Sequence, residues 1–171
     1  MQIILNKTQL SAAIHELATT LSARLLADDQ LVFAGIQQGG AEIGERIIGE
    51  LRHLHPGRAI RYGQLDVTFY RDDIRNNILT PDTMNMPFDI ANRTVVLIDD
   101  VLFTGRTIKA ALDTLLDMGR PAKVELCVLI DRKEHRQFPI QADIAALTVE
   151  TRKTDKVKLV NGEVVLIPGN G

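Results

Sequence analysis

Two adjacent carboxylates, Asp99 and Asp100, stand between a run of apolar residues and a short loop that contains glycine and threonine. The run before them, residues 95–98, consists of four branched apolar residues, which is typical of a strand buried on both faces of a parallel sheet. Residues 108–118 carry apolar side chains at helical spacing. The sequence therefore predicts a strand, an acidic pair, a loop and a helix start, the arrangement at which open α/β sheets bind ligands.

The loop of residues 104–107 has the composition of a site for a phosphate monoester. Amides at a helix N-terminus bind phosphate, the two threonines add hydroxyls, and Gly105 permits close approach and positive φ. Asp99 and Asp100 would repel a phosphate beside them, so we expect them to face a ribose diol or Mg²⁺ held through water. These residues alone leave two alternatives open: a solvated strand-to-helix turn and the acidic pocket of a receiver-type doubly wound domain.

A second strand–turn–helix pattern lies earlier in the chain. Residues 31–36 predict a buried strand, and residues 43–54 carry apolar side chains at helical spacing. The turn between them consists of Gln37, Gln38, Gly39 and Gly40. Two glycines after a strand permit an anion to contact backbone amides, and an ordinary tight turn is the alternative.

The other segments with polar residues in informative positions follow predicted strands. Residues 61–70 predict a strand, and the long polar stretch after it begins with Tyr70, Arg71, Asp72 and Asp73. Residues 123–130 predict another buried strand, which ends in Asp131 and Arg132. This pair either faces the ligand cleft or forms a salt-bridged strand end. Near the C-terminus, Asn161-Gly162 predicts a hairpin between residues 157–160 and 164–167.

Residues 95–107 resemble the thirteen-residue phosphoribosyl-pyrophosphate (PRPP) signature of type I phosphoribosyltransferases. The continuation into residues 109–120 and the Tyr-Arg-Asp-Asp run are similar to the PyrR family of pyrimidine-operon attenuation regulators and uracil phosphoribosyltransferases. This resemblance extends over nearly the whole chain. It implies one α/β domain, residues 1–171, with a central, mainly parallel sheet flanked by helices. It also implies a small hood built from the N-terminal segment and roughly residues 132–171.

The resemblance implies transfer of the phosphoribosyl group from PRPP to uracil, which yields UMP and pyrophosphate, with Mg²⁺ as cofactor. Asp99, Asp100 and Arg71 are the implied catalytic residues: the acid pair anchors the ribose hydroxyls and holds the metal through water, and Arg71 reaches the pyrophosphate. The implied ribose and phosphate contacts are Asp99, Asp100, Val101, Leu102, Phe103, Thr104, Gly105, Arg106 and Thr107.

Three further parts of the site follow from the same resemblance. The turn of residues 37–40 would hold pyrophosphate through its amides, although family members usually carry Lys or Arg where this chain has glutamines. The loop that begins with Tyr70, Arg71, Asp72 and Asp73 would close over PRPP as a lid. The hood would supply the base pocket, for which we expect contributions from Asp131, Arg132, Ile144 and Ala145.

Regulation through the pyrimidine-operon leader mRNA would require an exposed positive surface. Residues 132–158 contain seven Lys or Arg and four Asp or Glu, but a charge run is more often a solvated face. The family sequence Pro-Ile-Arg-Ala-Asp reads Pro-Ile-Gln-Ala-Asp at residues 139–143, one residue is inserted around 133–134, and Ala146-Leu147 replaces Gly-Lys. Two alternatives therefore stay open: an RNA-binding attenuator with little turnover, and a transferase for hypoxanthine or orotate.

Bulk properties agree with a globular enzyme or regulator. The chain has 171 residues, 45% hydrophobic and 25% charged residues, and a net charge of −2, so the whole molecule does not attract nucleic acid. Cys127 is the sole cysteine and lies in an apolar run, which predicts a buried thiol. No stretch reaches membrane-spanning length, so we expect a cytoplasmic protein. The family resemblance suggests a homodimer or higher homo-oligomer.

Overall fold

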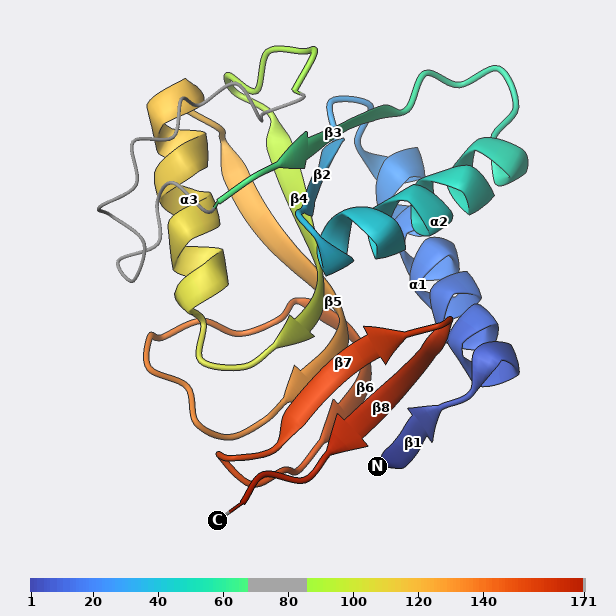
Figure 1. Cartoon of the computed structure of the whole chain (residues 1–171). Helices are drawn as coiled ribbons and strands as arrows, with labels where there is room; N and C mark the ends of the chain where they lie inside the picture. Colours follow the sequence, from blue (N-terminus) through green and yellow to red (C-terminus); the bar gives the residue numbers. More distant parts are fainter. Residues whose placement is uncertain (68–85, 171) are drawn as a thin grey trace.

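A five-stranded parallel sheet and a smaller antiparallel sheet organise residues 1–67 and 86–170, the part of the chain that the computed structural model describes (Figure 1). The parallel sheet has the order β3-β2-β4-β5-β6, with β2 Val32–Ile36, β3 Arg61–Leu65, β4 Thr94–Leu102, β5 Lys123–Arg132 and β6 Ile144–Val149. The antiparallel sheet has the order β1-β8-β7, with β1 Gln2–Leu5, β7 Lys156–Val160 and β8 Glu163–Ile167. The predicted lid residues Tyr70, Arg71, Asp72 and Asp73 lie outside the described residues.

Helices cover both faces of the parallel sheet. Helices α1 (Lys7–Ala27) and α2 (Gly39–Leu54) lie on one face, and α3 (Arg106–Met118) lies on the other (Figure 1). A capping box starts α1: the Asn6 side chain accepts from the Gln9 amide at 2.8 Å, and the Gln9 side chain accepts from the Asn6 amide at 2.9 Å. No helix within residues 1–67 or 86–170 has the length and apolar character needed to cross a membrane.

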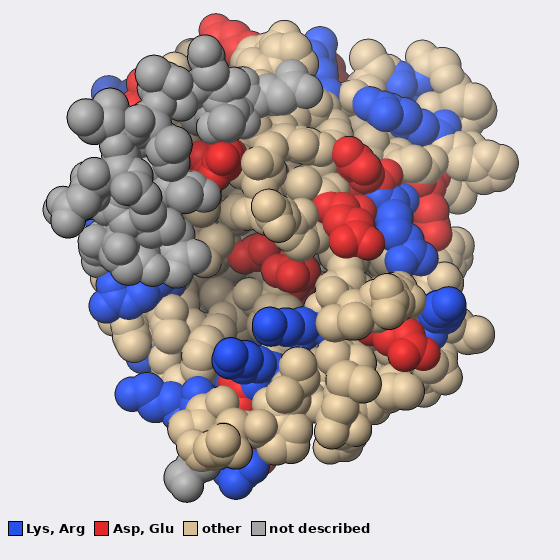
Figure 2. Space-filling model, viewed as in Figure 1, with Lys and Arg blue, Asp and Glu red and all other residues tan. Residues whose placement is uncertain are grey.

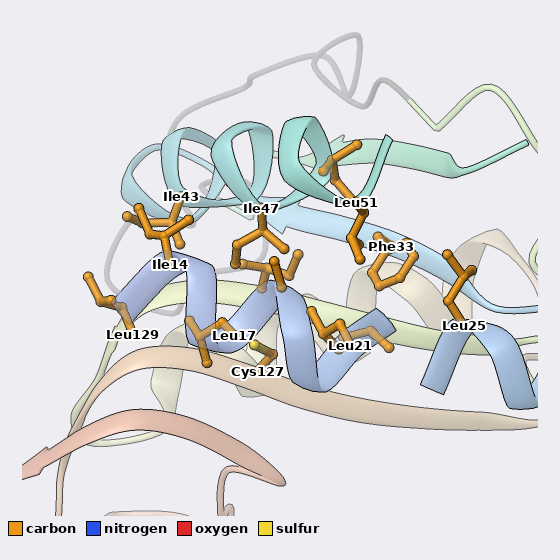
Figure 3. Close-up of a cluster of buried hydrophobic side chains, with 14 of the residues drawn as sticks. Ile14, Leu17, Leu21, Leu25, Phe33, Ile43, Ile47, Leu51, Cys127 and Leu129 are labelled. Atoms are coloured by element: carbon orange, nitrogen blue, oxygen red, sulfur yellow. The ribbon is translucent and has the colours of Figure 1, made fainter. Parts of the chain in front are cut away.

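The buried strands divide their side chains between two hydrophobic clusters. Phe33, Val96 and Cys127 pack with the apolar stripes of α1 and α2, part of which Figure 3 shows. Val95 and Leu97 pack with α3 on the opposite face. Because successive side chains of a strand point to opposite faces, continuous apolar runs are what a sheet covered on both sides requires.

The small antiparallel sheet forms the hood, and its position brings the two ends of the chain together (Figure 1). β1 pairs with β8, and the β7–β8 hairpin turns at Asn161 and Gly162, whose φ angles are 52° and 77°. Positive φ at both positions is the geometry that favours Asn-Gly, which confirms the predicted hairpin. The segment of residues 144–149 does not belong to the hood: it pairs in parallel with β5 as the edge strand of the main sheet.

Several predicted boundaries were wrong in an instructive way. The predicted strand of residues 61–70 ends at Leu65 among the described residues. Asp99 and Asp100 lie within β4 rather than after it, because β5 continues to pair with β4 up to Leu102. β2 pairs with β4 only as far as Ile98. The acid pair therefore begins where β4 loses one of its two neighbours.

Candidate active site

The loop between β4 and α3 encloses a cavity of about 320 Å³. Its lining consists of Asp99 and residues 101–108, which include eight of the nine residues predicted to contact ribose and phosphate. Gly105 is the N-cap of α3 with φ of 90°, a conformation that side-chain-bearing residues rarely adopt. The Thr104 hydroxyl accepts from the Arg106 amide at 3.2 Å. The loop thus presents backbone amides and hydroxyls at a helix N-terminus, as a phosphate monoester requires.

The two carboxylates serve different parts of this region. Asp99 lines the cavity, is only 6% exposed, and accepts from the Asp100 amide at 2.9 Å. Burial, followed by the negative charge of Asp100, raises the pKa of Asp99 well above its usual value. Asp100 instead packs against Gly39 at the start of α2 and accepts from the Val101 amide at 2.8 Å. A raised pKa beside a second carboxylate is common at functional sites.

The predicted pyrophosphate turn lies directly against the acid pair. A Cβ atom on Gly39 would overlap the Asp100 carboxylate, and one on Gly40 would lie 2.5 Å from the Ile98 carbonyl oxygen. Both positions therefore require glycine because α2 begins in contact with β4. The Gln37 amide donates to the Leu65 carbonyl at 2.8 Å, which ties the turn to β3. The structure thus brings together the turn and the acid pair, which are about sixty residues apart in the sequence.

Tyr62 is a residue near the site that the sequence analysis missed. Its hydroxyl donates to the Ala41 carbonyl in the first turn of α2 at 3.0 Å. The ring lies where Gly35 and Gly44 lack side chains, and burial raises the pKa of Tyr62 to about 12. The only sequence signal was the coincidence of a tyrosine in β3 with glycines in β2 and α2, and that coincidence becomes visible only once the three elements are packed.

Two of the four residues expected in the base pocket have partners within the protein. Asp131 forms an ion pair with Arg136 at 2.8 Å. Arg132 is 3% exposed, donates to the Thr151 hydroxyl at 2.8 Å, and lies 3.6 Å from the centre of the Phe103 ring. The alternative of a salt-bridged strand end therefore describes Asp131, although its partner is not the adjacent arginine.

Ile144 and Ala145 do not lie in the hood, contrary to the prediction. They open β6, paired with Cys127 and Val128 of β5. Within the hood, β7 contacts β4. A short apolar segment after a loop does not reveal whether it joins the main sheet or a second one, because the local pattern is the same in both cases.

Comparison with known proteins decides the family. A model of the phosphoribosyl transferase domain matches residues 2–161. The bifunctional protein PyrR of Roseiflexus sp. is 42% identical over 156 residues, which are 90% of this chain and 84% of that protein. The PyrR protein of Chloroflexus aurantiacus is 39% identical over 98% of this chain and 95% of its own length. The chain belongs to the PyrR family.

Solved structures support the same fold for this PyrR family member. Hypoxanthine phosphoribosyltransferase of Trypanosoma cruzi superposes with a TM-score of 0.73 at 14% identity, over 99% of this chain and 98% of that one. The corresponding enzyme of Staphylococcus aureus gives a TM-score of 0.67 at 21% identity, over 88% and 79% of the two chains. At such identities the likeness shows the fold alone. The predicted type I phosphoribosyltransferase fold is confirmed.

The glycine at the start of α2 provides a first test of this geometry. Gly39→Ala should lower the free energy of unfolding by about 1–3 kcal/mol, because the added methyl overlaps the Asp100 carboxylate. Gly49→Ala is the matched control in the same helix: no atom lies within 4 Å of its Cβ position, so the change should raise stability by about 0.5–1 kcal/mol. Urea denaturation measures both, and equal effects of the two changes would contradict the close approach.

The raised pKa of Asp99 predicts that ionisation of this carboxyl group lowers the free energy of unfolding. Because the folded protein binds the Asp99 proton more tightly than the unfolded chain, stability falls as pH rises from the unfolded pKa to the folded one. Asp99→Asn should therefore raise the free energy of unfolding at pH 7, with a gain that shrinks as pH approaches about 4. Asp29→Asn, in an exposed loop, should change stability little. A pH-independent effect of Asp99→Asn would refute a raised pKa.

Proposed function

We propose that this chain is a uracil phosphoribosyltransferase that converts uracil and PRPP to UMP and pyrophosphate. We further propose that it senses UMP or PRPP to regulate pyrimidine biosynthesis genes by RNA attenuation. Membership of the PyrR family supports both statements. The observation that carries the enzymatic one is the cavity in which an amide-lined loop at the start of α3 lies beside the buried Asp99.

The reaction places opposite charges on the two halves of PRPP, and the site matches both. As the bond from C1 of the ribose to pyrophosphate lengthens, positive charge develops on the sugar and negative charge on the leaving group. The carboxylates of Asp99 and Asp100 accept hydrogen bonds from the ribose hydroxyls and lie near the developing positive charge. The 5′-phosphate binds at residues 104–107, which fixes the sugar while water is excluded. No covalent nucleophile is needed.

The leaving pyrophosphate binds at the turn of residues 37–40. This turn lies at the N-terminus of α2, where free amides and the helix dipole favour an anion. The Gln37 amide is already bound to the Leu65 carbonyl, which leaves the amides of Gln38 and the two glycines for the anion. Neither glutamine supplies a cation, so we propose that Arg71 provides the positive charge from the loop that begins with Tyr70, Arg71, Asp72 and Asp73. All four residues of that loop lie outside the described part of the chain.

The acid pair also has the composition of a Mg²⁺ site completed by substrate. Mg²⁺ in phosphate-transfer sites commonly takes one or two carboxylates, several waters and substrate oxygens. The described residues contain no group of three or more His, Cys, Asp or Glu that would hold a metal by itself. Asp100 and Asp99 therefore fit as water-mediated contacts to magnesium that arrives with PRPP. The bound ion would neutralise charge on the pyrophosphate.

The base is proposed to bind between the carboxyl end of β5 and the hood. Asp131 stays a candidate contact there because it pairs with Leu102, the last residue of β4, which lines the cavity. Arg132 is already bound to Thr151 and stacked on Phe103, so we assign it to shaping the pocket. Ile144 and Ala145 lie in β6, which β5 separates from β4. We therefore assign them no direct contact with the base.

Incubation with PRPP, Mg²⁺ and uracil, hypoxanthine or orotate tests the enzymatic proposal. Uracil should be consumed with formation of UMP, and Asp100→Asn should reduce the rate. Gly105→Val should raise the KM for PRPP about tenfold or more, because valine disfavours φ of 90° and its Cβ would lie 3.3 Å from Ile140. Consumption of no base, together with unchanged UMP binding by Asp100→Asn, would refute the transferase function.

Regulation by RNA is the second candidate, and the distribution of charge favours it. Figure 2 shows Lys and Arg side chains over the lower half of one face, where the hood and the C-terminal loops lie, with acidic side chains in the middle. Arg152, Lys156 and Lys158 are all exposed in this part of the chain. The region is positive although the whole molecule carries a charge of −2.

A leader transcript of the pyrimidine genes should bind this protein more tightly in the presence of UMP. Because phosphate contacts release counterions, the affinity should fall steeply between about 50 and 200 mM salt. Replacing Lys156 and Lys158 by alanine should weaken binding and reduce the slope of log affinity against log salt by up to about two. Filter binding measures both quantities. Equal affinity for an unrelated hairpin would reduce the interaction to non-specific attraction.

A further inference from the structure

The segment after β5 runs along the outer side of the phosphate loop and binds its carbonyl groups. The Gln137 amide donates to the Thr104 carbonyl at 2.8 Å. Arg136 Nη1 donates to the Phe103 carbonyl. The Gln137 side chain accepts from Arg106 Nε at 2.7 Å. Three of the four residues 103–106 are thus bound by two adjacent residues that lie about thirty positions later in the sequence.

These contacts fix the orientation of the amides that face the cavity. In a trans peptide the carbonyl and the N–H of the same unit point in opposite directions. Binding the Phe103 carbonyl on the outer side therefore directs the Thr104 N–H inward, and binding the Thr104 carbonyl does the same for the Gly105 N–H. A loop with glycine in it would otherwise lose more conformational freedom when a phosphate binds.

Arg136 is itself held firmly in place. Its Nη2 donates to Asp131 at 2.8 Å, and its side chain is only 18% exposed. The Phe103 ring contacts both the Arg132 guanidinium and the edge-on His135 ring, whose centre is 5.8 Å away. The guanidinium of Arg136 thus bridges a strand end and the phosphate loop through two separate nitrogens. A lysine ammonium has a single nitrogen and cannot form both contacts in the same geometry.

We propose that Arg136 is a positioning residue for the 5′-phosphate subsite. By holding the Phe103 carbonyl outward against Asp131, it keeps the loop amides aimed at the phosphate before the nucleotide arrives. It does not contact the phosphate itself. This inference rests on the proposed function, because it assumes that a phosphoribosyl group occupies the cavity between Asp99 and the start of α3.

The alternative is that Arg136 stabilises the fold without any effect on phosphate binding. The two roles differ in a measurable way: a purely structural residue affects UMP and uridine alike, whereas a phosphate-positioning residue affects only the ligand that carries phosphate. Arg136→Met keeps the aliphatic stem near Gly105, which lies beside the Arg136 Cδ, but removes all donors. Arg136→Lys keeps the charge and one donor group.

The matched control is Lys133→Met in the same segment. Lys133 is exposed, and its side chain has no hydrogen bond or ion pair with any described residue. Lys133→Met removes one positive charge, as Arg136→Met does, but leaves every contact with the phosphate loop unchanged. Any general electrostatic effect of the segment on an anionic ligand would appear in this variant.

Isothermal titration of the full chain with UMP and with uridine, together with thermal unfolding, tests the proposal. Arg136→Met should weaken UMP binding about tenfold, the size of one hydrogen bond from a charged donor, and leave uridine affinity within about twofold. Arg136→Lys should lie between this variant and wild type, and Lys133→Met should match wild type. In the transferase assay, Arg136→Met should raise the KM for PRPP more than it lowers kcat.

The other outcomes overturn the proposal in distinguishable ways. If Arg136→Met changes UMP and uridine affinity equally, or changes neither while wild type binds UMP, Arg136 does not position the phosphate loop, and the proposed function stands. If Lys133→Met weakens UMP binding as much as Arg136→Met, the effect is general electrostatics. If wild type binds neither UMP nor PRPP, the proposed function fails and this inference fails with it.

Discussion

The contact between the start of α2 and the end of β4 is the constraint on which the rest of the site depends. Gly39 and Gly40 leave no room for side chains because the Asp100 carboxylate and the Ile98 carbonyl occupy that space. This contact places the N-terminus of one helix beside the strand end from which the loop to a second helix departs. Two helix N-termini therefore converge on one acid pair, which is the arrangement that the proposed PRPP site requires.

The position of the acid pair has an energetic consequence. A carboxylate as deeply buried as Asp99 resists ionisation, and the neighbouring charge of Asp100 adds to that resistance. Full ionisation of the acid pair is thus costly in the unliganded site, and a nearby sugar cation or magnesium ion would offset that cost. Natural proteins retain such unfavourable arrangements where function requires them, and the two large hydrophobic clusters on either side of the sheet offset the cost.

The loop between β4 and α3 is held by contacts from outside the loop itself. Gly105 permits its conformation, but Arg136 and Gln137 of a later segment bind its carbonyl groups. The same segment carries exposed positive charge and connects, through Arg132 and Thr151, to the chain that enters the hood. The loop after β4 and the chain that enters the hood are therefore linked by a short path of direct contacts.

The sequence by itself determined the fold class, the buried strands, the glycine-containing loop before α3, the hairpin at Asn161 and the family. Each of these depends on neighbours along the chain: apolar runs, glycine at a position of positive φ, and motif spacing. Only the tertiary structure decided that Asp99 and Asp100 lie inside β4 and that residues 144–149 join the main sheet. It also decided that Tyr62 packs against α2 and that Arg136 binds the loop after β4. Those features depend on which distant segments pack together, and a local pattern carries no information about its partner.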